Sequence, residues 1–135
     1  NSNVTSINTN QVVKTVYDPS PAGFCLPPSG AFTGFTTTGN VTSTVTDFNV
    51  SGAWDNGWHF YCNTDGTGET IYFPASGYRR QTAGTTNFVG GSALVWSAIP
   101  SSNLQGRCLH AQQYIVHPKS DSERGGSFPV RPVRE

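Results

Sequence analysis

The sequence has 135 residues, enough for one domain that buries a real core without further help. Only 12% of the residues are charged, and the eight basic and eight acidic side chains cancel. This balance argues against nucleic acid or an anionic membrane as a partner, because both attract a basic excess. No stretch approaches the roughly 20 apolar residues of a membrane span, so no membrane insertion is expected. With no initiating Met and no signal peptide, the chain looks like a mature or excised piece of a larger protein.

The N-terminal end predicts a tail followed by one domain. Residues 1–13 are polar and are interpreted as a linker or the end of a preceding domain. Residues 14–135 are expected to form a single domain. Weak alternation over residues 11–17 predicts a first strand that crosses this boundary.

A short apolar run and one helix come next. Residues 24–26 predict a brief buried run that ends at two prolines. Ser29–Phe35 is the best helix candidate, because Ser29 can cap it and Ala31, Phe32 and Phe35 share one face. Its glycines make the helix marginal, so tertiary packing has to hold it.

A β-hairpin forms the centre of the predicted core. Residues 42–50 are interpreted as a loop plus an exposed strand that leads toward it. Two aromatic runs, residues 58–62 and 70–73, flank a Thr-Asp-Gly-Thr-Gly linker whose glycines can turn the chain. Pro74 then ends the second strand, because it has no N–H to donate.

The second half predicts further strands and polar loops. Arg107, Leu109 and Ala111 are expected on one strand face, with Leu109 in the core, and Cys108 and His110 on the exposed face. The expected strands are residues 93–99, 107–111, 114–116 (as partner or continuation) and 128–133; the expected loops or turns are 80–87, 101–106 and 117–126.

The three cysteines leave two readings open. Cys25 and Cys62 are the pair that would form a disulfide, with Cys108 left over. Alternatively, all three are reduced and behave as buried small hydrophobic residues.

Four blocks of the sequence resemble a known family. YDPSPAGFCLPPSGAFTGF (17–35), FPASGYR (73–79), VWSAIPSS (95–102) and FPVRPVRE (128–135) are similar to the Fibrobacter succinogenes major paralogous domain. This domain occurs at the C-terminus of surface proteins and fimbrillin-like adhesins of gut Bacteroidales. The resemblance implies an α+β, mostly antiparallel β domain with a C-type-lectin-like fold, short helices and long loops. In that fold the two termini meet in a strand pair, and the C-terminal half presents a loop-rich ligand face.

The sequence departs from the family's pattern between residues 80 and 126. Framework blocks are intact while the intervening positions carry unrelated side chains, as in the variable proteins of diversity-generating retroelements; ordinary divergence would give the same contrast. Exposed polar side chains in this region are the candidate ligand-binding residues, against the alternative of plain solvated surface. They are Arg80, Asn103, Gln105, Arg107, His110, Gln112, Gln113, His117, Lys119 and Asp121.

No residue pattern predicts catalysis or a metal site. The carboxylates fall mostly in turns, where Asp bonds its own backbone. The three histidines lack metal-ligand spacing, and a Cys108–His110 dyad would have no orienting third group. The calcium-binding loop of sugar-binding C-type lectins is missing. Trp54-Asp55-Asn56 contains the residues of that family's Trp-Asn-Asp strand motif, but in another order. We therefore expect no enzyme activity, no cofactor and no metal.

These observations predict an extracellular or cell-surface binding module, a part of a larger surface or pilus protein. Its partner would be a host or bacterial surface protein or glycan, recognised without calcium by the loops of residues 80–126. The alternative is a structural or spacer domain without a ligand.

Overall fold

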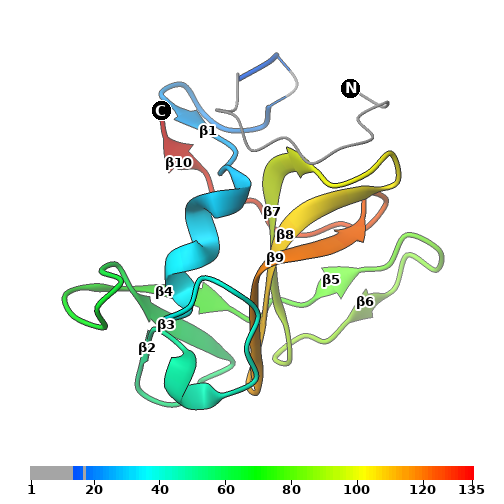
Figure 1. The fold of residues 1–135 in the computed structure, drawn as a ribbon. Helices are drawn as coiled ribbons and strands as arrows, with labels where there is room; N and C mark the ends of the chain where they lie inside the picture. The colour runs from blue at the N-terminus through cyan, green and yellow to red at the C-terminus, as the bar shows by residue number, and fades with distance from the viewer. Residues whose placement is uncertain (1–13, 17) are drawn as a thin grey trace.

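The computed structural model describes residues 14–16 and 18–135, and the strands of this part form four small antiparallel sheets (Figure 1). The helices are short and of the 3-10 type, so the predicted mostly antiparallel α+β class is confirmed. The linker predicted at residues 1–13 and most of the strand at 11–17 lie outside the described residues. No helix in the described part is long and apolar enough to cross a membrane.

The first and last strands of the described part pair with each other. β1 (Phe24–Cys25) runs antiparallel to β10 (Val133–Arg134), at the top left of Figure 1. Lys14 Nζ donates to the carbonyls of residues 20, 21 and 24 and lies 3.7 Å from the Glu135 carboxylate. The burial predicted for residues 24–26 is wrong for Phe24, which is 41% exposed because this two-residue strand lies at the surface.

The predicted helix forms with the predicted bounds. η1 (Ser29–Phe35) is a 3-10 helix that runs between the β1–β10 pair and the β2–β3–β4 sheet (Figure 1). The prediction that Ser29 caps it is wrong: Pro28 occupies the N-cap, and no side chain bonds there. Phe32 is buried and Phe35 half-buried, so packing holds the helix in place of a cap.

The predicted hairpin is confirmed and carries much of the core. β3 (Gly57–Tyr61) pairs with β4 (Thr70–Pro74), and β2 (Val50–Ser51) adds a third strand. Phe60 is fully buried and stacks on Phe35 with ring centroids 4.0 Å apart. η2 (Val45–Asp47) precedes β2, where the sequence predicted a loop.

The second three-stranded sheet packs against this hairpin. β7 (Ala93–Pro100), β8 (Gln105–Gln112) and β9 (Ile115–Glu123) follow in that order. Its inner face places Leu109 in the core, as predicted. Trp58 Nε1 donates to the carbonyl of residue 112 at 2.9 Å, which ties the two sheets together.

The sequence predicts a β9 that is too short and a last strand that is too long. The loop predicted at residues 117–126 is strand as far as Glu123, because its polar residues pair with residues 105–110 of β8. The strand predicted at 128–133 reduces to β10, since Pro129 and Pro132 have no N–H for a ladder. The exposure predicted for Cys108 is also wrong: it lies opposite Trp96 and is 1% exposed.

Candidate ligand-binding groove

A groove lies where the short hairpin of β5 (Tyr78–Arg79) and β6 (Thr86–Asn87) meets β8 and β9. It consists of two adjoining hollows with volumes of about 500 and 340 Å³. We call it the polar groove and define it by the residues that line it. Both hollows share Tyr78, Asp121, Ser122 and Phe128; Arg80, Gln81, Thr82, Gln105, Glu123 and Gly126 complete the first, and Phe88, Ser92, Leu94, His110, Gln112 and Ser120 the second.

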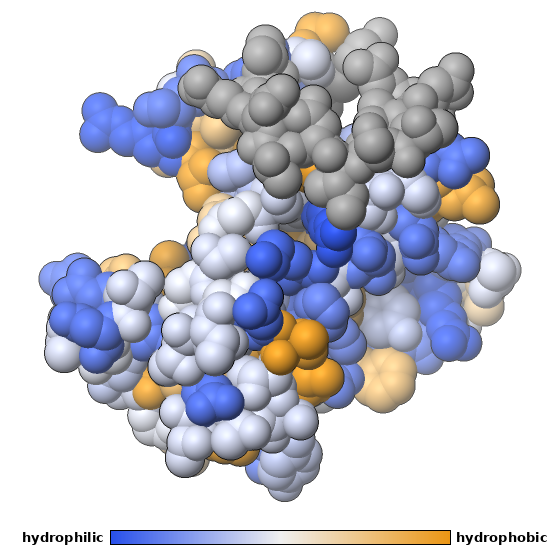
Figure 2. Space-filling model, in the orientation of Figure 1, coloured by the Kyte–Doolittle hydropathy of each residue, from blue (hydrophilic) through white to orange (hydrophobic). Residues whose placement is uncertain are grey.

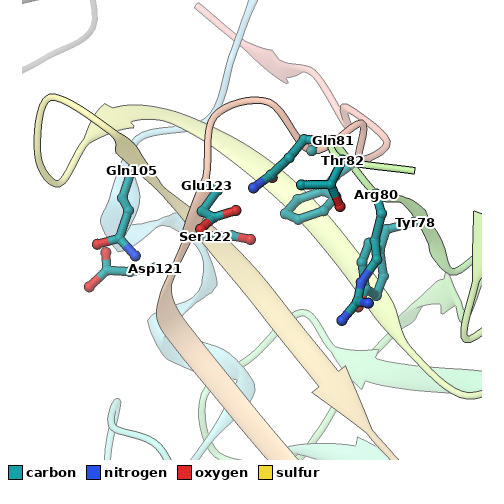
Figure 3. Close-up of a pocket in the computed structure, with 10 residues that line it drawn as sticks. Tyr78, Arg80, Gln81, Thr82, Gln105, Asp121, Ser122 and Glu123 are labelled. Atoms are coloured by element: carbon teal, nitrogen blue, oxygen red, sulfur yellow. The ribbon is translucent and has the colours of Figure 1, made fainter. Parts of the chain in front are cut away.

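Hydrogen-bonding side chains from three separate segments line the first hollow (Figure 3). In Figure 3, Gln105 and Asp121 lie together on one side of the β9 ribbon, and Glu123 lies toward Gln81 on the other. Carboxylates accept hydrogen bonds, while amides both donate and accept them. This wall can therefore satisfy a ligand that carries several hydroxyl or amide groups.

A row of aromatic rings, of which Tyr78, Phe88 and Phe128 line the groove, forms its apolar part. Phe128 stacks on Trp96 at a centroid distance of 4.3 Å and meets the edge of Tyr78 at 5.6 Å. Tyr78 in turn stacks on Phe88 at 6.0 Å. Phe88 keeps 58% of its surface exposed, so the row ends in a ring that is open to a ligand.

The backbone holds Phe88 in an unusual conformation. Its φ is 56°, in the left-handed region that a bulky residue rarely adopts. Its carbonyl accepts the N–H groups of both Gly91 and Ser92 at 2.9 Å, and Gly77 N–H donates to the Ser92 carbonyl. Strained backbone conformations that the surrounding hydrogen bonds hold in place cluster at ligand sites. The strain at this exposed ring therefore points to a functional position.

Backbone bonds fix the β5–β6 hairpin at the groove. Arg79 and Ser127 exchange N–H···O bonds of 3.1 and 3.0 Å. The Arg79 guanidinium closes the tip of the hairpin through a 2.6 Å bond to the Gly84 carbonyl. Gln81 packs so tightly on Gly125 that a side chain at position 125 would displace it. The loop predicted at residues 80–87 is thus an anchored hairpin, with β6 at its end.

One ion pair lies beneath the groove. Arg107 Nε is 3.2 Å from Asp121 Oδ1, and Arg107 Nη1 donates to the Lys119 carbonyl at 2.5 Å. Only 18% of the Arg107 side chain is exposed. Arg107 therefore holds β8 against β9 and orients Asp121, and it does not itself line the groove.

Burial favours the uncharged forms of His110, His117 and Cys108. His110 and His117 lie opposite each other on β8 and β9. Burial lowers the pKa of both histidines. His117 lowers the pKa of His110 further, and Arg107 and Lys119 lower that of His117 against the opposing effect of Asp121. Burial raises the pKa of the Cys108 thiol to about 12, so it is not an activated nucleophile.

Half of the predicted ligand-binding residues line the groove. Arg80, Gln105, His110, Gln112 and Asp121 do. The other five do not: Asn103 and Gln113 are exposed in turns, and Arg107, His117 and Lys119 are half-buried on β8 and β9.

The sequence missed the aromatic row and part of the polar wall. The sequence predicts Tyr78 as a member of a framework block and Phe128 as the start of a strand. Glu123 falls among the carboxylates predicted to lie in turns. A rise in Ser, Asp and Glu over residues 120–123, separated from Phe128 by four residues, is the one signal in the sequence that points to this wall.

The three cysteines are free thiols, so the Cys25–Cys62 disulfide is not formed. Cys25 belongs to the β1–β10 pair, whereas Cys62 follows β3 at the far end of η1. Each lines a different hollow. The alternative reading, with all three reduced, matches the structure; the expectation that all are buried holds only for Cys108, since Cys62 is exposed.

No group of three or more His, Cys, Asp or Glu side chains in the described ranges could hold a metal ion. That the protein works without metal, cofactor or catalysis stays a prediction. No family model, curated protein or solved structure matches this chain. The resemblance drawn from the four sequence blocks therefore stays a hypothesis.

Proposed function

We propose that this domain is a calcium-independent glycan-binding module of an extracellular surface or pilus protein, and that the polar groove is its binding site. The observation that carries the proposal is the meeting of an aromatic row, which ends in the exposed Phe88, with a wall of carboxylates and amides. Small-ligand sites combine apolar surface with a few directed polar groups in this way.

The chemistry of the groove suits a sugar better than a charged ligand. A pyranose ring has C–H faces, which pack on aromatic rings such as Tyr78 and Phe88, and hydroxyl edges. Asp121 and Glu123 accept hydrogen bonds from hydroxyl groups, and Gln105 donates and accepts. Asp121 is already paired with Arg107, and Glu123 shares the groove with the Arg80 guanidinium, so the groove has no strong net charge to attract an ion.

The arrangement of the chain supports a C-type-lectin-like scaffold for this site. The strands nearest the two ends pair as β1 and β10, and short helices flank small antiparallel sheets. The groove is built from residues 78–128, the half in which that scaffold presents its ligands.

The test is a glycan array with the purified chain, run with and without a chelator. The groove variant Arg80→Ala/Gln81→Ala removes two exposed side chains of the wall. The matched control is Asn103→Ala/Gln113→Ala, which removes two exposed polar residues outside the groove.

We expect a chelator-insensitive hit that the groove variant weakens roughly tenfold or more and that the control leaves unchanged. Loss of binding with chelator would contradict the metal-free mechanism. An equal loss in both variants would move the site away from the groove. Binding on a protein array but not on the glycan array would make the ligand a protein instead of a glycan. No binding on either array would favour the spacer domain without a ligand.

A further inference from the structure

A second hollow lies along η1 and shares no lining residue with the polar groove. Its volume is about 410 Å³, within the range of small-molecule sites. Figure 2 shows the outline of the molecule indented between the β1–β10 pair and the β2–β3–β4 sheet, the elements between which η1 runs. We call this hollow the phenylalanine pocket; Phe32, Phe35, Ile71, Phe73, Val133 and Arg131 form its main walls.

The aromatic walls of this pocket are rigid. Phe35 and Phe73 meet edge to face at a centroid distance of 5.0 Å, and Phe32 and Phe73 at 6.2 Å. All three rings belong to or pack against the hydrophobic core, so they are held in place before any ligand arrives. A preformed wall of this kind favours a flat apolar ligand, because little ordering is needed on binding.

Arg131 is the single charged residue that lines the pocket. Its Cζ lies 4.6 Å from the centroid of the Phe73 ring, and Nη1 donates to the Tyr72 carbonyl at 2.6 Å. These two contacts fix the guanidinium at the wall. Within the described part of the chain, Arg131 makes no ion pair and no other hydrogen bond.

The remaining donors of Arg131 therefore have no acceptor among the described residues. A guanidinium binds a carboxylate through two parallel N–H···O bonds, and such charge-assisted bonds are among the strongest in proteins. Cationic charge beside a pocket without any Asp or Glu attracts an anion and disfavours a cation.

From this pairing of apolar rings with an uncompensated guanidinium, we propose that the phenylalanine pocket binds a small aromatic carboxylate. The ring of the ligand lies against the half-buried Phe35 and Ile71, which the buried Phe32 and Phe73 support from behind, and its carboxylate meets Arg131. This is a second site, independent of the glycan groove.

The proposal is tested by titrating the purified chain with naphthoate in a calorimeter. Naphthalenemethanol and naphthylmethylamine serve as the neutral and cationic comparators. We expect naphthoate to bind at least roughly tenfold more tightly than either, because only its carboxylate can accept two charge-assisted bonds from the guanidinium. Equal binding of the three compounds, or no binding of naphthoate at millimolar concentration, overturns the proposal.

The Arg131→Met variant removes the charge and retains an apolar stem. It is expected to lose the preference for naphthoate while it still binds naphthalenemethanol, which shows that the pocket remains formed. Arg124→Met is the matched control: Arg124 also bonds backbone carbonyls, Ser102 at 2.6 Å, but lies outside the pocket. Undiminished naphthoate binding in Arg131→Met overturns the proposal.

Cys62 reports where the ligand lies. It is exposed and lines the pocket, so naphthoate is expected to slow its reaction with a thiol reagent several-fold. The measurement is made in a Cys25→Ser background, with Cys108 buried. Binding without any protection of Cys62 would place the ligand elsewhere and overturn the assignment.

Discussion

Arg107 and Asp121 face each other across β8 and β9, with Arg107 Nε 3.2 Å from Asp121 Oδ1. The next pair along the ladder is Cys108 with Ser120. A bulge follows it at Pro118 and Lys119, where β9 has one more residue than β8. Beyond this bulge the ladder has to resume in the correct register. A cross-strand ion pair at that point favours the register that places Ser122 in the groove.

We expect a modest but measurable coupling energy for this pair. In a double-mutant cycle with Arg107→Met and Asp121→Asn, urea unfolding should give about 0.5–1 kcal/mol, because both side chains are partly solvated. The Lys14–Glu135 pair, longer at 3.7 Å and more exposed, is the matched control and should give less. A coupling that does not weaken in high salt would contradict an ionic origin.

Gly57 is the position in the hairpin where a side chain cannot fit. A Cβ there would collide with the Phe73 carbonyl and the Tyr72 ring, and its φ is 157°. Gly57→Ala should therefore cost about 3 kcal/mol or more in the free energy of unfolding, since the backbone must shift. Gly52→Ala is the matched control, because its Cβ meets nothing within 4 Å.

The control still carries the strain of a positive φ of 75°, so it should cost about 1–2 kcal/mol. Denaturation curves of both variants measure the difference directly. Equal losses in the two variants would mean that conformational strain, and not the contact with β4, decides the effect at Gly57.

The hairpin could be predicted from the sequence because its signals are local. Glycines turn the chain, two aromatic runs flank them, and Pro74 marks the end of β4, all between residues 57 and 74. The same reasoning found η1 but not its cap. A proline at the N-cap with no side-chain bond leaves no residue pattern to recognise.

Segment 117–123 shows what local signals miss. It reads as a charged loop, because His, Lys, Ser, Asp and Glu follow each other without apolar alternation. Only the pairing with β8 makes it a strand, and that pairing depends on tertiary contacts. The groove is hidden for the same reason: Tyr78 and Phe128 are 50 positions apart in sequence, yet their ring centroids are 5.6 Å apart.

The three thiols should differ in reactivity. Cys62 is exposed, Cys25 half-buried and Cys108 buried with a pKa raised by burial to about 12. In native protein at pH 8, mass spectrometry after alkylation should show Cys62 modified first and Cys25 later. Cys108 should react only when the chain unfolds, because the thiolate is the reactive form.

Unfolding in urea before alkylation is the control, and it should make all three sites equivalent. Rapid labelling of Cys108 in the folded chain would mean that the β7–β8–β9 sheet opens locally. Loss of labelling at both Cys25 and Cys62 without reductant, restored by reductant, would show that these two residues pair after all.

His110 and His117 make the stability of the fold depend on pH. The pKa of each is lower in the folded chain than its ordinary value near 6.5, first because of burial. Arg107 and Lys119 lower the pKa of His117 further, while Asp121 opposes them. The unfolded chain therefore binds more protons than the folded chain as the pH falls below about 6.5.

These lowered pKa values fix the direction in which folding stability changes with pH. Stability is fully present above pH 6.5 and falls as the pH drops toward the lower folded-state pKa values. The midpoint of urea unfolding should thus decrease between pH 7.5 and 5, and His110→Gln/His117→Gln should flatten this slope. His59→Gln removes the remaining histidine without touching β8 or β9 and is the matched control. A slope that survives in the double variant would assign the pH dependence to groups outside this cross-strand pair.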